Sequence, residues 1–210
     1  MKLKELESIL QDCEVFAEPK IQYEQYPTTA HLAARMLYTA DTVYDDIEDK
    51  AVGDFGSGCG ILSIAANILG ASYSVGFDID QDAIAIAQEN SDNFETDIDF
   101  VLTDLSLDTG VLDRYKGSLD TIVMNPPFGT KNKGVDMVLL KKAIELANHA
   151  VYSLHKTSTR DHIMKKAKEW GVTCEVVAEM KFDVPMMYKF HKKKSVDIAV
   201  DFLRFEKSDV

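Results

Sequence analysis

The sequence of 210 residues is poor in cysteine and has no long hydrophobic run. Its three cysteines, Cys13, Cys59 and Cys174, are odd in number and far apart, which argues against a disulfide framework or a zinc cluster and favours a reducing compartment. No apolar stretch reaches the roughly 18 residues of a membrane-spanning helix, so we expect no contact with a membrane interior. Residues 1–7 lack an apolar core, and we expect no secretory signal there.

Positive charge is scarce in the first 130 residues. They contain 7 Lys and Arg against 24 Asp and Glu, a balance of −17, whereas residues 131–210 contain 16 against 11, a balance of +5; together these give the net charge of −12. A basic surface on one part of a molecule can bind phosphate groups even when the whole chain is acidic. Runs of charge also occur on surfaces that contact only water, so the asymmetry alone leaves both interpretations open.

Apolar segments typical of buried strands alternate with segments typical of helices. The expected strands are residues 51–55, 73–78, 99–104, 120–124 and 150–154, and the expected helices are residues 3–12, 61–69, 81–94, 136–149 and 158–170, with one more from Thr28 or Thr29 to about Thr39. Two further strands, 174–181 and 196–205, are separated by a loop too short for a crossover helix, so they should pair antiparallel. The alternation predicts an α/β fold, a doubly wound, Rossmann-like domain with a mostly parallel sheet.

A single domain accounts for residues 1–210, because no internal repeat or low-complexity linker divides the sequence. Its N-terminal part, residues 1–45, contains expected helices around an irregular segment with Gln25 and Thr28, whose polar side chains can contact a ligand that the segment covers. A structural role, with Thr28 or Thr29 as the N-cap of the next helix, explains these residues equally well.

A glycine-rich loop follows the first expected strand and opens the next helix. Gly56, Gly58 and Gly60 let the backbone approach a ligand closely, and the helix N-terminus offers unpaired N–H groups. The Gly-x-Gly-x-Gly spacing differs from the dinucleotide fingerprint, and no Gly-Lys-Ser/Thr sequence of a P-loop is present. Asp54 in the preceding strand would repel a phosphate but suits an ammonium group, a combination that points to S-adenosylmethionine. A purely structural tight turn is the alternative.

Acidic residues stand at the ends of the second and third expected strands, where ligands bind in open α/β sheets. Asp78 is placed to accept hydrogen bonds from both hydroxyls of a ribose, although an NAD-dependent enzyme would place an acid there too. Asp104 is placed to accept a hydrogen bond from an adenine amino group, or else is an ordinary loop carboxylate. Asp80 and Asp82 are better explained as residues at the start of the next helix, with Asp80 as its N-cap.

The fourth expected strand ends in Asn125-Pro126-Pro127-Phe128. The two prolines lack backbone N–H groups and cannot continue a sheet, so the chain leaves the sheet at Asn125 in a stiff, extended loop. The Asn125 side-chain oxygen and the Pro126 carbonyl can accept the two hydrogens of a planar amine, and Phe128 can stack on its ring. The acceptors favour a localised nitrogen lone pair and stabilise the positive charge that develops as a methyl group arrives. A rigid turn without catalytic use is the alternative.

Basic and aromatic side chains are interleaved after this motif. Lys131 and Lys133 follow it directly, and the 183–195 loop, the expected substrate loop, contains the further candidate RNA-binding residues Tyr188, Phe190, His191, Lys192, Lys193 and Lys194. The lysines can hold a phosphate backbone, and the aromatic rings can stack on unpaired bases. A solvated basic loop fits the pattern equally well. The histidines show no metal-ligand spacing, so we expect no metal site.

In combination, these motifs resemble class I S-adenosylmethionine-dependent methyltransferases, and the Asn-Pro-Pro-Phe form is similar to those acting on exocyclic adenine or planar amide nitrogen. The closer resemblance is to the eukaryotic methyltransferase-like family that makes N6-methyladenosine in small-subunit (18S) ribosomal RNA. The resemblance covers essentially the whole chain and rests on the segments 24–28, 77–80, 124–131, 150–156 and 188–197.

The resemblance implies a seven-stranded sheet with the last strand antiparallel, S-adenosylmethionine as the cofactor, and Asn125–Phe128 as the catalytic motif. The expected cofactor contacts are Gln25, Thr28, Asp54, Gly56, Gly58, Cys59, Ile61, Asp78, Asp104 and Leu105. It also implies a small zinc-binding adaptor of the Trm112 type as an obligate partner, and action in the nucleus, including the nucleolus, and in the cytoplasm. Because strand 99–104 should be a sheet edge, we expect it to pair with this adaptor.

Two other functions remain open. A protein glutamine side chain also presents a planar amide NH2, so a protein glutamine N5-methyltransferase is one alternative, although the lysine-rich C-terminal part favours a polyanion. A non-catalytic RNA-binding module with a relic pocket is the other. The intact glycine loop, the strand-end aspartates and the Asn125–Phe128 motif argue against that second alternative.

Overall fold

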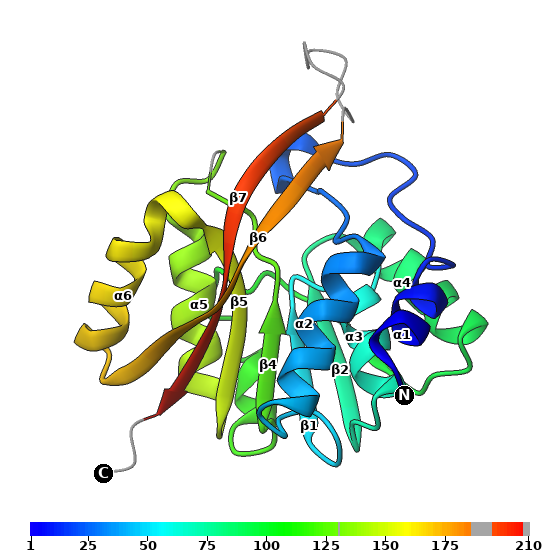
Figure 1. The fold of residues 1–210 in the computed structure, drawn as a ribbon, viewed down its shortest axis with the longest axis horizontal. Coiled ribbons are helices and arrows are strands. Elements are labelled where there is room, and N and C mark those ends of the chain that lie inside the picture. The colour runs from blue at the N-terminus through cyan, green and yellow to red at the C-terminus, as the bar shows by residue number, and fades with distance from the viewer. Residues whose placement is uncertain (130, 186–194, 208–210) are drawn as a thin grey trace.

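The structure, a computed structural model, describes residues 1–129, 131–185 and 195–207. Seven strands form one sheet in the order β3-β2-β1-β4-β5-β7-β6 (Figure 1). The strands are β1 Ala51–Phe55, β2 Tyr73–Asp78, β3 Asp99–Leu102, β4 Thr121–Met124, β5 Ala150–Lys156, β6 Val172–Pro185 and β7 Ser195–Lys207. Strand β7 is antiparallel to both of its neighbours, and all other pairs are parallel. The expected doubly wound sheet with an antiparallel last strand is therefore confirmed.

Helices cover both faces of this sheet. The α-helices are α1 Leu3–Leu10, α2 Ala30–Thr42, α3 Ile61–Ile68, α4 Gln81–Asn93, α5 Val135–Leu146 and α6 Arg160–Glu169, with short 3-10 turns η1 Ile21–Tyr23, η2 Val111–Tyr115 and η3 Thr157–Thr159. Leu37 of α2 and Ile64 of α3 belong to one hydrophobic cluster, and Leu140 of α5 and Ile163 of α6 belong to the other. Among the described residues, no helix is long and apolar enough to span a membrane.

The helix N-caps show how local sequence sets these boundaries. The Oγ1 atom of Thr29 accepts a hydrogen bond from the Leu32 N–H at 3.3 Å, and the Asp80 carboxylate accepts one from the Asp82 N–H at 3.2 Å. Thr29 is thus the cap of α2, which leaves Thr28 available for another contact, and Asp80 caps α4 as expected. Helix α6 begins at Arg160, two residues later than the expected start at residue 158, because Thr157–Thr159 form η3.

Several strands differ in length from the sequence prediction. Strand β3 ends at Leu102, so Asp104 lies in a loop, and β5 continues to Lys156. The β6–β7 hairpin is longer than expected, with paired residues from Val172↔Lys207 to Pro185↔Ser195. Antiparallel pairing, with one register shift between Val176 and Ala178, extends to Pro185↔Ser195, so Phe182 and the ends of the expected 183–195 loop belong to strands. The rest of that loop lies outside the described residues.

The order of β2, β1 and β4 determines where a ligand can bind. Phe55 at the end of β1 is in register with Phe77 of β2 on one side and with Met124 of β4 on the other. The chain order reverses between β1 and β4, and ligands of open α/β sheets bind at the carboxyl end of such a switch point. The glycine loop therefore emerges between Asp78 and Asn125.

Asp54 of β1 supports the glycine loop from inside the protein. It is 1% exposed, and its Oδ2 atom accepts hydrogen bonds from the Ser63 N–H at 3.1 Å and from the Ser63 hydroxyl at 2.7 Å. Its Oδ1 atom is buried and has no hydrogen-bond partner among the described residues. Burial raises the pKa of Asp54 to about 7, against the opposing effect of the two Ser63 hydrogen bonds.

Replacement of Asp54 by asparagine should change how stability depends on pH. In the folded protein Asp54 keeps its proton up to about pH 7, whereas in the unfolded chain it loses it near pH 4. The folded state thus binds more protons between these values, and wild-type stability falls as the pH rises through them. Relative to the wild type, Asp54→Asn should gain about 2–4 kcal/mol in free energy of unfolding between about pH 4.5 and pH 7.5.

Urea unfolding of the unliganded protein at several pH values measures this gain. The exposed carboxylate Asp92 provides the matched control, because Asp92→Asn makes the same chemical change at the surface of α4. Parallel pH profiles for the wild type and Asp54→Asn would contradict the assigned burial effect.

Candidate active site

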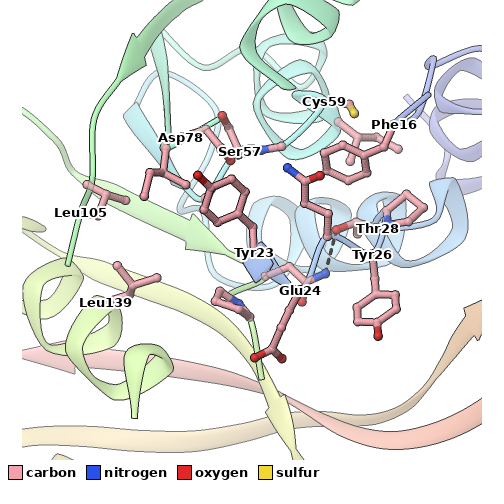
Figure 2. Close-up of a pocket in the computed structure, with 18 of the residues that line it drawn as sticks. Phe16, Tyr23, Glu24, Tyr26, Thr28, Ser57, Cys59, Asp78, Leu105 and Leu139 are labelled. Atoms are coloured by element: carbon pink, nitrogen blue, oxygen red, sulfur yellow. Dashed lines mark hydrogen bonds between the residues drawn. The ribbon is translucent and has the colours of Figure 1, made fainter. Parts of the chain in front are cut away.

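A cavity of about 220 Å3 lies at the carboxyl ends of β1, β2 and β4. Figure 2 shows that side chains from the N-terminal segment, the glycine loop, the strand ends and α5 surround it. Most of the expected cofactor contacts line this cavity: Gln25, Thr28, Gly56, Gly58, Cys59, Ile61, Asp78, Asp104 and Leu105. Asp54 does not line it, because its side chain points to Ser63 behind the loop. Asn125 and Pro127 form part of the wall.

The glycine loop is built for close packing. Gly56, Gly58 and Gly60 have φ angles of 73°, 53° and 86°, a region that side-chain-bearing residues rarely adopt. A Cβ on Gly58 would lie 3.1 Å from the Phe16 ring, and one on Gly60 would lie 3.1 Å from Ala87. At Gly58 and Gly60 the loop therefore fits between the N-terminal segment and α4 only without side chains, whereas Gly56 is required for its φ angle alone.

Asp78 holds the loop and still faces the cavity. Its Oδ2 atom accepts the Gly58 N–H and its Oδ1 atom accepts the Asp80 N–H, both at 2.8 Å. Burial raises the pKa of Asp78 above its ordinary value, and these backbone hydrogen bonds oppose the rise. Burial also raises the pKa of Cys59 to about 12, so that Cys59 contributes a neutral thiol to the wall.

Asp104 and Leu105 lie in the loop after β3 and line the cavity beside Asp78. The Oδ1 atom of Asp104 accepts hydrogen bonds from the Ser106 N–H at 2.8 Å and the Ser106 hydroxyl at 2.6 Å. This turn fixes the carboxylate without using its second oxygen, which can accept a hydrogen bond from a ligand.

Asn90 of α4 fastens the N-terminal segment over the glycine loop. Its side chain is fully buried, accepts the Glu14 N–H at 2.9 Å, and donates to the carbonyl oxygens of Glu14 at 3.0 Å and Cys59 at 2.9 Å. Sequence reasoning missed this residue, since an asparagine inside a helix carries no signal of a partner 76 residues away.

Lys20 and Gln25 make a second attachment of the same segment. The Gln25 amide donates to Asp80 Oδ2 at 2.6 Å, and its oxygen accepts the Lys20 N–H at 2.7 Å. The Lys20 ammonium bridges Asp80 and Asp82. Gln25, which was expected to contact the cofactor, lines the cavity, and these hydrogen bonds hold it in the cavity wall.

The catalytic motif leaves β4 as the prolines require. Asn125 Nδ2 donates a hydrogen bond to Thr28 Oγ1 at 2.8 Å, which leaves Asn125 Oδ1 as an acceptor at the cavity. Pro126 is buried, and Phe128 lies beyond the cavity lining. The structure thus brings together Thr28 and Asn125, which the sequence had suggested only separately.

The Phe128 ring has two neighbours that sequence reasoning did not assign to the site. Phe182 of β6 packs edge-on against it, with ring centroids 5.7 Å apart and planes at 86°. The Lys156 ammonium lies 5.5 Å from the Phe128 centroid, within range of a cation–π interaction. Both residues come from strand ends that the sequence prediction placed in loops.

The candidate RNA-binding residues fall into two groups. Lys131 and Lys133 are exposed in the loop that follows Phe128. The others, Tyr188, Phe190, His191, Lys192, Lys193 and Lys194, lie outside the described residues. Within the described ranges, no cluster of three or more His, Cys, Asp or Glu side chains is placed to hold a metal ion.

Comparison with known proteins identifies the family. Residues 25–126 match the family model of ribosomal protein L11 methyltransferase (PrmA). The chain is 57% identical to the rRNA N(6)-adenosine-methyltransferase METTL5 of Danio rerio, over 98% of this chain and 99% of that one, and 51% identical to Mettl5 of Drosophila melanogaster, over 98% and 97%. The crystal structure of PH1948 from Pyrococcus horikoshii superposes with a TM-score of 0.86 at 34% identity, over 99% and 98% of the chains. The chain therefore belongs to the METTL5 family of rRNA N6-adenosine-methyltransferases.

Proposed function

We propose that this protein is an S-adenosylmethionine-dependent enzyme that methylates the N6 amine of an adenosine in 18S ribosomal RNA. The observation that carries this proposal is the orientation of Asn125. Its amide nitrogen is held by Thr28, so its oxygen is left to accept a hydrogen from a flat amine at the cavity. The relatives named as rRNA N(6)-adenosine-methyltransferases support the same substrate class.

The residues around the cavity fit S-adenosylmethionine. Asp78 lies where a carboxylate can accept hydrogen bonds from ribose hydroxyls, and the second oxygen of Asp104 suits an adenine amino group. The glycine loop lines the cavity with Gly56 and Gly58, whose positive φ angles present backbone rather than side chains to a ligand. Asp54 takes no direct part in this fit, because its carboxyl points to Ser63 behind the loop and burial raises its pKa to about 7.

When bound, the cofactor supplies an electrophilic methyl group on its sulfonium. The residues of the chain prepare the other reactant. The Asn125 oxygen and the Pro126 carbonyl accept the two N6 hydrogens, which localises the nitrogen lone pair and stabilises the positive charge that develops on N6. Phe128 stacks on the base and sets the line of approach. No side chain with a shifted pKa is needed, because the N6 proton can pass to water after transfer.

A protein substrate is the second candidate, since residues 25–126 match the L11 methyltransferase family. That match covers the cofactor half of the domain and ends at Pro126, before Phe128 and the basic C-terminal part. The net charge of +5 for residues 131–210 favours a polyanion as the substrate. The non-catalytic alternative is disfavoured by the intact cavity and by the positioned Asn125.

Methyl transfer to RNA tests the proposal directly. The protein, together with the adaptor, is incubated with labelled S-adenosylmethionine and either 18S ribosomal RNA or a release-factor protein. We expect label in RNA, recovered as N6-methyladenosine. Asn125→Ala should lower kcat at least about 100-fold, because one of two acceptors for the amine is lost, while the Kd for S-adenosylmethionine stays within about 2-fold of the wild type.

Asn148→Ala serves as the matched control for this variant, since Asn148 is exposed and lies at the opposite, amino-terminal end of β5. Label found only in protein would replace the RNA proposal by the glutamine alternative. Full activity of Asn125→Ala would refute the assigned mechanism.

We also propose that a small zinc-binding adaptor of the Trm112 type binds at β3. In the described part of the chain, β3 pairs only with β2 and is one edge of the sheet. Leu102 is 52% exposed, and Ile79, directly after its partner Asp78 on β2, is also exposed. An apolar open edge favours addition of a strand from a partner.

Backbone alternation identifies the residue to change. The Thr103 N–H donates to the Asp78 carbonyl of β2, so the N–H of Leu102, one residue earlier, points to the open edge. Leu102→Pro removes that donor without breaking the β2 ladder and should weaken adaptor binding about 10-fold or more. Leu102→Ala keeps the donor and should bind more tightly than Leu102→Pro. Co-purification and calorimetry measure the affinity of each variant for the adaptor. A folded Leu102→Pro variant that binds the adaptor like the wild type would exclude strand addition at β3.

A further inference from the structure

Glu24 connects the cavity to the loop behind the catalytic motif. Its side chain is only 8% exposed, and its Oε1 atom accepts the Lys131 N–H at 2.7 Å. Lys131 is 107 residues away in the sequence and follows Phe128 closely. A carboxylate that accepts a backbone N–H in a buried setting makes a strong, charge-assisted hydrogen bond. Glu24 is therefore positioned to fix the backbone of this loop.

The backbone of Glu24 explains why its side chain reaches the loop. Glu24 ends η1 in the left-handed conformation, with φ 51° and ψ 43°, which residues other than glycine seldom adopt. As a result, the side chains of Tyr23 and Glu24 point in different directions. In Figure 2 the Tyr23 ring points toward Asp78, whereas the Glu24 side chain extends away from Asp78. An unusual conformation of this kind persists only where its surroundings hold it.

The loop after Phe128 needs an external anchor. It is bounded by Gly129 and Gly134, with φ angles of 69° and 83°, and glycines restrain the backbone little. Lys131, whose N–H Glu24 accepts, lies three residues after Phe128. On the other side of the motif, Thr28 holds Asn125 at 2.8 Å. The segment from Glu24 to Thr28 thus contacts the catalytic motif both before and after its four residues.

We propose that Glu24 is a positioning residue for methyl transfer. Through the Lys131 N–H its carboxylate fixes the 129–134 loop, and with it the Phe128 ring on which the target base stacks. This inference rests on the proposed function and extends it to a residue outside the catalytic motif. It assigns to Glu24 an effect on the transfer step rather than on cofactor binding, although Glu24 lies at the cavity.

Three substitutions separate the carboxylate from the backbone. Glu24→Ala removes the acceptor, Glu24→Gly removes it but tolerates the left-handed backbone, and Glu24→Gln keeps an oxygen that can accept the Lys131 N–H. Glu18→Ala is the matched control, because Glu18 is an exposed glutamate of the same segment. Each full-length variant is assayed on 18S ribosomal RNA, and its Kd for S-adenosylmethionine is measured by calorimetry.

We expect kcat to fall about 10- to 100-fold in Glu24→Ala and Glu24→Gly, with the cofactor Kd within about 2-fold of the wild type. Glu24→Gln should recover to within about 5-fold of the wild type, and Glu18→Ala should be unchanged. A wild-type kcat in Glu24→Ala would overturn this inference but leave the proposed function intact. So would a cofactor Kd that weakens as much as kcat falls, or a Glu24→Gln as inactive as Glu24→Ala. A wild-type protein that, with the adaptor present, binds the cofactor without methylating RNA would overturn the proposed function, and this inference with it.

Discussion

The hydrogen bond from Asn125 Nδ2 to Thr28 Oγ1 fixes the orientation of the Asn125 side chain at the cavity. An asparagine amide has a donor end and an acceptor end, and Thr28 takes the donor end. The acceptor end is then left for another partner. Pro126 and Pro127 keep the backbone extended and prevent it from rejoining the sheet. Under the proposed function, this arrangement lets an amide without a titrating group accept a hydrogen from a planar amine.

The distribution of charge favours a cationic ligand at the cavity and a polyanionic ligand elsewhere on the protein. Lys20 neutralises Asp80 and Asp82, whereas the described residues give Asp78 only backbone donors. The part of the chain up to residue 130 therefore keeps an excess of negative charge near the glycine loop, which attracts a sulfonium and an ammonium group. The same field repels phosphates. A nucleic-acid substrate is thus expected to approach from residues 131–210, where the net charge is positive.

The sequence predicted which residues lie at the strand ends better than it predicted contacts between distant elements. The glycine loop, Asp78 and Asn125 were recognised because each follows an apolar strand, and a parallel sheet brings such ends together. Asn90, Phe182 and Lys156 were missed, because their roles come from partners on other elements rather than from local spacing. Asp54 was expected in the cavity on account of its charge alone. In the structure, the N–H and the hydroxyl of Ser63 in α3 donate hydrogen bonds to the Asp54 carboxylate, which therefore points away from the cavity.

The N-terminal segment has little regular structure of its own, which makes its contacts interdependent. Between α1 and α2 it forms only the η1 turn, and ordering each residue costs about 1–2 kcal/mol of backbone entropy. The bonds to Asn90 and Asp80 offset part of this cost on the cofactor side, and the bonds to Asn125 and Lys131 offset part on the catalytic side. A ligand that contacts the segment from within the cavity stabilises all of these bonds together. Order in the cofactor site and order in the catalytic motif therefore share one source of free energy, because one segment belongs to both.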